Sequence, residues 1–337
     1  MKFRKLAALC LSALCLLSLA ACGGNANANA SDGVRRMAYV VSVRDEYLSK
    51  LEEAVIEAAA NHNVAMEILH AGEDSVKVRD CVEAAKSHGN DAVLINMVAA
   101  EDASSCIEAA GDMKVVFINR VPVDYGLLNA NVAAVASDER LSGAYQGQFL
   151  ADYFNSIGKT DVSYILLHGT GGLVHTELRT QGVLNEMEAA GLNLTSAAVL
   201  EAHYDRYAAR DAMADLLSEE LVTEFDCILS NNDAMALGAI MAMKDAGIDP
   251  HSVPIVGIDA TADALQAISD GEMIMSVHQS AEMQADGAVM AALNMLSGNN
   301  LTNQTDYEIS DESDYLVYVP FEPVTRENYA DFMAVVE

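Results

Sequence analysis

Short apolar runs and amphipathic segments alternate along this chain from residue 37 onward. The expected strands are 37–43, 64–70, 91–97, 115–119, 132–137, 162–169, 196–202, 227–232, 254–259 and 273–279. The expected helices are 47–61, 76–88, 139–156, 177–190, 207–221, 234–246, 261–270 and 281–297. Apolar, β-rich runs separated by helices predict parallel sheets covered by helices on both faces. The pattern therefore predicts an α/β fold with two doubly wound, Rossmann-like lobes.

The N-terminus has the pattern of an export signal. Three of the first five residues are Lys or Arg, and an apolar run at 6–19 follows. That run is too short to span a bilayer comfortably and has no stop-transfer flank. The letters LAAC end at Cys22 and resemble a bacterial lipobox. We therefore predict a signal peptide at 1–21 and a lipidated Cys22, with an ordinary cleaved signal and a chance cysteine as the alternative.

Residues 22–36 are predicted to be the lipidated cysteine and a flexible tether, because the polar run NANANASDG has no apolar periodicity. One acyl chain binds membranes only marginally, so stable anchoring needs more than one. The resemblance to bacterial lipoproteins implies such an anchor. The expected location is the outer face of the cell membrane, either periplasmic or at the cell surface, with membrane contact only through the lipid.

Acidic composition excludes several classes of partner. The chain has 50 Asp and Glu against 19 Lys and Arg, a formal net charge of −31. Such a surface argues against nucleic acid and anionic lipid as partners. A transcriptional regulator is opposed by this charge, by the export signal and by the absence of a helix-turn-helix pattern.

No pattern typical of catalysis or of a resident cofactor appears. GxSxG, HExxH and P-loop sequences are absent. Beyond the lipobox, Cys81, Cys106 and Cys227 have no CxxC spacing and no nearby His pair, which excludes a disulfide framework or a zinc site. Small buried thiols are the preferred interpretation, with a Cys81–Cys106 pair as the alternative. We expect no enzymatic activity and no cofactor.

The most informative stretch runs from Cys227 to Asp259. Its first apolar strand ends in Asn231-Asn232-Asp233, and its second ends in Gly257-Ile258-Asp259. Two strand ends thus present an amide and a carboxylate at the same edge of a parallel sheet. Open α/β sheets bind their ligands at that edge.

This stretch closely resembles the periplasmic galactose/glucose-binding proteins, within the ribose- and galactose-type sugar ABC transporter substrate-binding family. The resemblance covers roughly residues 37–335 and implies a type I periplasmic binding protein fold, with three crossover hinges between two lobes. The implied hinges are near 134–137, 279–282 and 313–318. The implied lobes are 37–135 with 281–315, and 136–280 with 316–337.

The resemblance also implies ten ligand-binding residues. They are Asp45, Tyr47, Asn119, Arg120, His175, Arg179, Tyr204, Asn232, Asp259 and Gln279. Carboxylates and amides would hydrogen-bond sugar hydroxyls, while Tyr47 and Tyr204 would stack on the sugar ring. From the residues alone, a helix N-terminal carboxylate is the preferred interpretation of Asp45. A surface turn is the alternative for Asn119-Arg120, and it explains Arg120 better than it explains the pair.

Two positions depart from the family pattern. Leu173 and His175 stand where the family carries a histidine and an aspartate, which is expected to change the preferred hydroxyl, ring size or anomer. The connection FNSIGKTD also has too few carboxylates to form the calcium loop of the enteric galactose-type proteins. We therefore expect no bound metal.

The resemblance implies an extracytoplasmic lipoprotein that captures a galactose- or glucose-like monosaccharide between closing lobes and delivers it to the permease of an ABC importer. A sugar sensor that presents its closed form to a chemoreceptor or sensor kinase is one alternative. A receptor for a non-hexose ligand, such as a pentose, is another.

Overall fold

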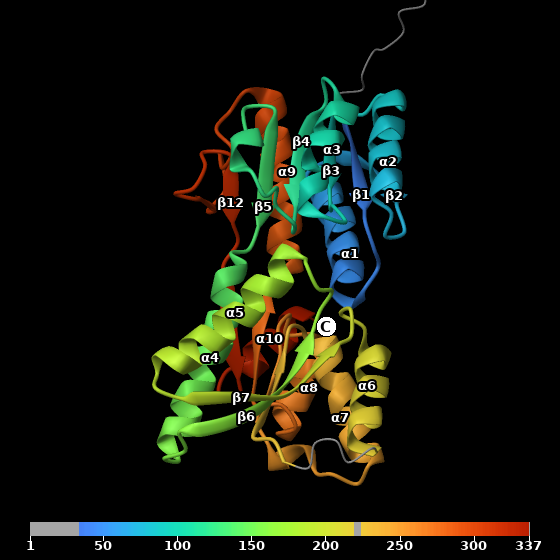
Figure 1. Cartoon of the computed structure of the whole chain (residues 1–337). Coiled ribbons are helices and arrows are strands. Elements are labelled where there is room, and N and C mark those ends of the chain that lie inside the picture. The colour runs from blue at the N-terminus through green and yellow to red at the C-terminus, as the bar shows by residue number, and fades with distance from the viewer. Residues whose placement is uncertain (1–33, 219–223, 337) are drawn as a thin grey trace, which may run out of the picture. The chain divides into compact units, whose positions relative to one another are not determined.

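The computed structural model describes residues 34–218 and 224–336. The predicted signal peptide, Cys22 and most of the predicted tether lie outside the described residues. The described chain forms two sheets built mainly from parallel strands, each with helices on both faces (Figure 1). The predicted doubly wound α/β architecture is confirmed. Within these two ranges, none of the helices has the length and apolar character needed to cross a membrane.

The first sheet has seven strands in the order β11-β12-β5-β4-β3-β1-β2. Its strands are β1 (Arg35–Val41), β2 (Val64–His70), β3 (Ala92–Ile95), β4 (Lys114–Ile118), β5 (Val132–Ala136), β11 (Glu308–Ile309) and β12 (Leu316–Tyr318). The helices around it are α1 (Glu46–Asn61), α2 (Ser75–Ser87), α3 (Ala103–Ala110) and α9 (Ala281–Ser297), with short 3-10 turns η1 (Ala100–Asp102) and η2 (Tyr125–Leu127). Only β11 pairs antiparallel in this sheet.

The second sheet has six strands in the order β13-β10-β9-β8-β6-β7. Its strands are β6 (Asp161–His168), β7 (Asn193–Glu201), β8 (Cys227–Ser230), β9 (Ile255–Val256), β10 (Met275–Gln279) and β13 (Phe321–Thr325). Its helices are α4 (Glu139–Ser156), α5 (Val174–Ala189), α6 (Arg206–Ser218), α7 (Asp233–Asp245), α8 (Ala262–Asp270) and α10 (Tyr329–Val336), with a 3-10 turn η3 (Pro250–Ser252). Only β13 pairs antiparallel here.

Each sheet buries apolar side chains on both faces, because neighbouring residues of a strand point to opposite sides. In β1, Met37 and Tyr39 pack with α1 and α9, whereas Ala38 and Val40 pack with α2 and α3. In the second sheet one apolar cluster joins α4 and α5, and the other joins α6, α7 and α8. Both faces of both sheets are therefore covered, as the continuous apolar runs predict.

The chain passes between the two sheets three times. It leaves the first sheet between β5 and α4, returns between β10 and α9, and leaves again between β12 and β13. The third passage differs from the expectation. Leu316 and Val317 are buried and pair with β5, so the passage follows Tyr318 and the boundary predicted before residue 316 falls one strand early.

Close contact between α4 and α5 depends on two glycines of α4. A Cβ atom at Gly143 in α4 would lie 2.1 Å from the backbone oxygen of Arg179 in α5. A Cβ at Gly147, one turn further, would lie 2.6 Å from the backbone oxygen of Val183. The position of α5, and with it Arg179, is therefore set by the missing side chains on α4.

We expect Gly143→Ala to destabilise the protein, although alanine ordinarily favours a helix over glycine by about 1 kcal/mol. The new methyl group must displace backbone, which costs about 1–3 kcal/mol in a packed interior. Urea unfolding measures the loss. Asp152→Ala, at an exposed position of the same helix, is the control. A Gly143→Ala protein more stable than the wild type would contradict this account of the α4–α5 contact.

Candidate functional site

All ten predicted site residues lie where strands reach the carboxyl edges of the two sheets. Asp45 and Tyr47 follow β1, and Asn119 and Arg120 follow β4. The other six follow β6 to β10 or, for Gln279, end the last of these strands. Together with Leu48 and Glu139, the ten line one cavity. The parallel topology thus brings residues separated by more than 200 positions to a single place.

The cavity has a volume of about 30 Å³. That volume holds only one or two water molecules. Three larger cavities share lining residues with it, with volumes of about 450, 220 and 220 Å³. Arg120 lines the central cavity and two of these neighbours.

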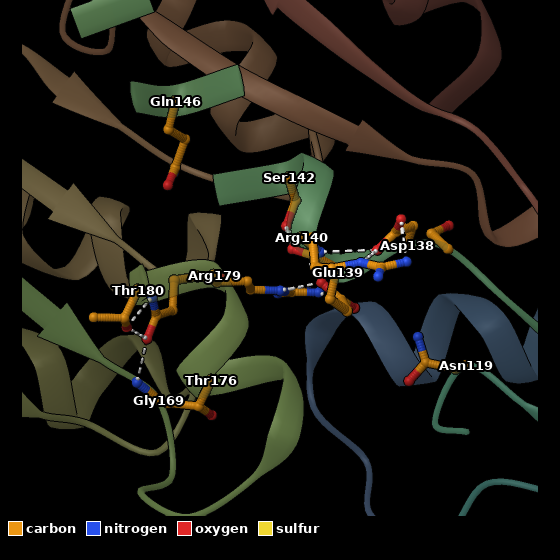
Figure 2. Close-up of polar contacts among 12 residues, drawn as sticks. Asn119, Asp138, Glu139, Arg140, Ser142, Gln146, Gly169, Thr176, Arg179 and Thr180 are labelled. Atoms are coloured by element: carbon orange, nitrogen blue, oxygen red, sulfur yellow. Dashed lines mark hydrogen bonds and ion pairs between the residues drawn. The ribbon is translucent and has the colours of Figure 1, made fainter. Parts of the chain in front are cut away.

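A buried ion pair joins α4 to α5 at this cavity (Figure 2). Arg179 donates from Nε to Glu139 Oε2 at 2.7 Å and from Nη2 to Glu139 Oε1 at 2.8 Å. Its Nη1 donates to the backbone oxygen of Asn231 at 2.9 Å. Burial alone would lower the pKa of Arg179, but the charge and hydrogen bonds of Glu139 offset it and raise that pKa. Arg179 is thus a fixed, charged donor.

Glu139 was not among the predicted site residues. The sequence places it at the start of a helix, three residues after β5, and an acidic residue in a first helical turn has an ordinary explanation in the helix dipole. The available signal was that a carboxylate closely follows a strand end, as for Asp45 and Asp259. In the structure Glu139 lines the cavity and pairs with Arg179.

Asn119 and Arg120 turn into the cavity from the end of β4. Asn119 has a left-handed φ of 69°, which is uncommon for a residue other than glycine. Arg120 donates from Nη1 to the backbone oxygens of Met97 at 2.8 Å and Val98 at 3.0 Å. Burial lowers the pKa of Arg120, which the charge of Asp45 opposes. The pair therefore faces the cavity, and the surface-turn alternative is wrong.

Asp45 and Asn232 cap helices as well as lining the cavity. Asp45 Oδ1 accepts from the backbone nitrogen of Leu48 at 2.6 Å, and Asn232 Oδ1 accepts from that of Met235 at 3.0 Å. Each side chain has a second polar atom beyond the capping oxygen. Burial raises the pKa of Asp45. The helix-cap interpretation and the site interpretation therefore hold together for both residues.

Asp259 lies in a strained and buried position after β9. Its φ is 113°, and its exposed fraction is 7%. Such a backbone conformation costs about 1–3 kcal/mol and persists where the surroundings enforce it, commonly at functional sites. Burial raises the pKa of Asp259 well above its ordinary value, which the charge of Arg179 opposes. No hydrogen bond to its carboxylate is found among the described residues.

Two aromatic side chains meet at the second-lobe side of the cavity. The rings of His175 and Tyr204 have centroids 5.3 Å apart and planes inclined by 32°. The Tyr204 hydroxyl lies 2.5 Å from Thr176 Oγ1. Burial lowers the pKa of His175 well below its ordinary value, and the charges of Arg120 and Arg179 add to that effect. His175 is therefore neutral at pH 7.

Three buried polar atoms at the cavity have no hydrogen-bond partner. They are the Tyr47 hydroxyl, Arg120 Nε and Gln279 Nε2, half of the six such atoms in the described chain. Buried polar groups in folded proteins are almost always paired, because leaving one unpaired costs the free energy of its desolvation. This concentration of unpaired donors beside two carboxylates fits a site for a ligand with several hydroxyl groups.

Comparison with known proteins identifies the family of this chain. Residues 37–300 match the family model described as a periplasmic binding protein domain. The D-galactose/methyl-galactoside binding periplasmic protein of Haemophilus influenzae is 31% identical over 75% of this chain and 78% of its own. A protein of Rhizobium meliloti with a proposed rhizopine-binding function is 32% identical over 80% of this chain and 82% of its own.

A solved structure shows the same fold. The ABC transporter solute binding protein of Bacillus halodurans C-125, with bound myo-inositol, has a TM-score of 0.76 and 27% identity, and the match covers 90% of this chain and 99% of that one. The chain belongs to the family of periplasmic binding proteins. The prediction of a solute-binding protein rather than an enzyme is confirmed by these relatives.

A buried carboxylate beside the cavity makes the stability of the folded protein depend on pH. Asp233 is fully buried, and it accepts from Ser276 Oγ at 2.7 Å and from the backbone nitrogen of Thr261 at 2.9 Å. Burial raises the pKa of Asp233 to about 7. The folded state therefore retains a proton that the unfolded chain releases above about pH 4. The resulting stabilisation is complete below that pH and is lost as the pH rises to about 7.

We expect the Tm of the ligand-free protein to be higher at about pH 5.5 than at about pH 8, and Asp233→Asn to reduce the difference. Thermal unfolding followed by circular dichroism measures both. Asp152→Asn removes an equal charge from an exposed position and is the control. An unchanged difference in Asp233→Asn would show that this carboxyl does not titrate in that window.

Proposed function

We propose that this protein captures a galactose- or glucose-like monosaccharide between its two lobes and delivers it to the permease of an ABC importer. One observation carries the proposal. Ten polar and aromatic residues from both sheets surround one cavity, with three unpaired buried donors among them. The names of relatives include galactose and ribose, and a related structure holds myo-inositol. A ring with several hydroxyl groups is common to all three.

The donors and acceptors suit such a ring. The carboxylates of Asp45 and Asp259 accept from hydroxyl groups, and charge-assisted hydrogen bonds of this kind are shorter and stronger than neutral ones. Arg120 and Arg179 donate back to the hydroxyl oxygens. Tyr47 adds a flat ring and an unpaired hydroxyl. A site built this way discriminates strongly against ligands that lack a hydroxyl, since its own groups would stay unpaired.

Capture requires the lobes to move. The central cavity of about 30 Å³ has no room for a sugar ring, and the lobes connect through only three passages of chain. Hinges of this kind let two lobes separate and close with little internal change. Ligand binding then shifts the population toward the closed form that the transporter recognises. Cys22 would hold the protein by its lipid at the outer face of the cell membrane.

A thermal-shift screen of residues 34–337 against galactose, glucose, ribose and myo-inositol tests the proposal. A ligand that binds only the folded state raises its Tm by mass action. We expect a clear increase with galactose or glucose. An increase only with ribose or myo-inositol would reassign the ligand. No increase with any of the four would overturn the proposal of a sugar-type ligand.

Asp259→Asn should affect stability and binding in opposite directions. The ligand-free variant should be more stable, because a buried carboxylate with a raised pKa is removed. Its affinity for the sugar should fall by roughly 10- to 100-fold, the value of a hydrogen bond to a charged group. Unfolding and isothermal titration calorimetry measure the two effects. Asp211→Asn, an exposed control, should change neither. An unchanged affinity in Asp259→Asn would contradict a binding role for this carboxylate.

An ion pair joins the lobes beside the site. Arg206 at the start of α6 donates from Nε to Glu46 Oε1 at 2.8 Å and from Nη2 to Glu46 Oε2 at 2.7 Å, and Glu46 begins α1 around the first sheet. Arg206 Nη1 also donates to Asp263 Oδ2 at 2.8 Å, within the second lobe. Of these two partners of Arg206, only Glu46 belongs to the other lobe, so only that contact must break when the lobes separate.

We expect Glu46→Gln to weaken sugar binding by about two- to fivefold, the value of a partly exposed ion pair. Asp263→Asn removes a partner of the same arginine within one lobe, so it should leave the affinity unchanged. Calorimetric titration at low salt and at about 1 M salt compares them, since salt should abolish the Glu46→Gln effect. Equal losses in both variants would argue against a contact that favours the closed form.

A further inference from the structure

A second cavity adjoins the central one and has a different chemical character. Its volume is about 220 Å³, and it shares Asn119, Arg120, Glu139 and His175 with the central cavity. A group attached to a ligand in the central cavity would therefore enter it between these side chains. Both lobes contribute to its walls.

Apolar side chains form much of its wall. They come from the segments that follow β3 and β4 in the first lobe and from the start of α5 in the second. They include Val98, Val121, Tyr125, Leu173, Val174 and Leu178. All are partly exposed, and Val174 retains 41% of its accessible surface. Covering such surface is favourable in proportion to its apolar area.

Arg120, which this cavity shares with the central one, has an unpaired Nε, but the other charged groups of this cavity already have partners. Arg140 donates to Asp138 Oδ1 from Nε at 2.7 Å and to Asp138 Oδ2 from Nη2 at 2.8 Å (Figure 2). It also donates to Glu312 Oε1 from Nη1 at 3.0 Å. The Tyr318 hydroxyl donates to Glu312 Oε2 at 2.8 Å and lies 3.2 Å from the Tyr125 hydroxyl. Glu139 is paired with Arg179. This cavity therefore offers a ligand mainly apolar contacts, whereas the central cavity offers it mainly hydrogen bonds.

Leu173 is an unfavourable residue at its position before α5, and contact with an apolar ligand group would explain its presence there. It is the N-cap residue of α5 and provides no side-chain cap, although polar residues are strongly favoured there. Asp45, Asn232 and Ser280 supply such caps to α1, α7 and α9. Leu173 lines this cavity and the 450 Å³ cavity, but it does not line the central one. Its effect therefore falls on what extends from the ring and not on the ring hydroxyls.

We propose that this second cavity is a subsite for a bulky apolar substituent on the sugar ring, so that the protein takes aryl glycosides as well as free monosaccharides. The inference rests on the proposed function, since the ring itself must occupy the central cavity. It assigns to Leu173, Val174 and Leu178 a role in selecting the substituent.

Calorimetric titration with galactose, glucose and the methyl and phenyl glycosides of each, in both anomers, tests the subsite. In at least one anomer of the sugar that binds, the phenyl glycoside should bind about tenfold more tightly than the methyl glycoside, because the phenyl ring buries more apolar surface. The double variant Val174→Ser with Leu178→Ser changes no charge and should remove this ratio while leaving the affinity for the free sugar within about twofold. Ile157→Ser, exposed and outside the cavity, is the control.

The outcomes separate this inference from the proposed function. Binding of none of these sugars and glycosides overturns both. Binding of a free sugar, with its phenyl glycosides weaker than its methyl glycosides in both anomers, overturns the subsite alone. The subsite is also overturned if the phenyl glycoside binds more tightly and keeps this advantage in the double variant. The phenyl ring would then contact residues other than Val174 and Leu178. The affinities of the phenyl and methyl glycosides are compared within each variant, so a general loss of stability does not affect their ratio.

Discussion

Parallel pairing of strands is the constraint on which the rest of this structure depends. In both sheets it brings the carboxyl ends of successive strands to one edge, so each strand can contribute a residue to the same cavity. The helices that return the chain between strands cover both faces, which explains why the strand interiors are almost wholly apolar. The residues of the candidate site therefore lie at the carboxyl ends of strands or in the segments that follow them, whereas the strand interiors serve packing.

The cavity concentrates interactions that a protein optimised for stability would avoid. Asp259 has a left-handed backbone and no hydrogen bond to its carboxylate among the described residues, and three nearby donors are buried without partners. Glu139 and Arg179 offset part of this cost by pairing with each other, which leaves Arg179 charged and fixed in place. A ligand that forms hydrogen bonds with these unpaired groups can recover the free energy that their burial costs.

Sequence alone predicted the elements whose patterns are strong. The ten expected strands, β1 to β10, and all eight expected helices are present, because apolar runs and helical periodicity are local signals. Short or exposed elements were missed: β11 has two exposed residues, and β12 and β13 are recognised only by their pairing partners. Glu139 was missed for a related reason. Its role depends on Arg179, forty residues away, which no local pattern contains.

The passages between the sheets have a consequence for when the protein can fold. The face of the first sheet that carries Tyr39 is closed by α9, and the edge beside β5 is occupied by β12, both from the last sixty residues. Until that part of the chain is synthesised, the first lobe exposes an apolar face and an unpaired strand edge. A nascent chain of this topology therefore cannot complete its first lobe until nearly all of it has been synthesised.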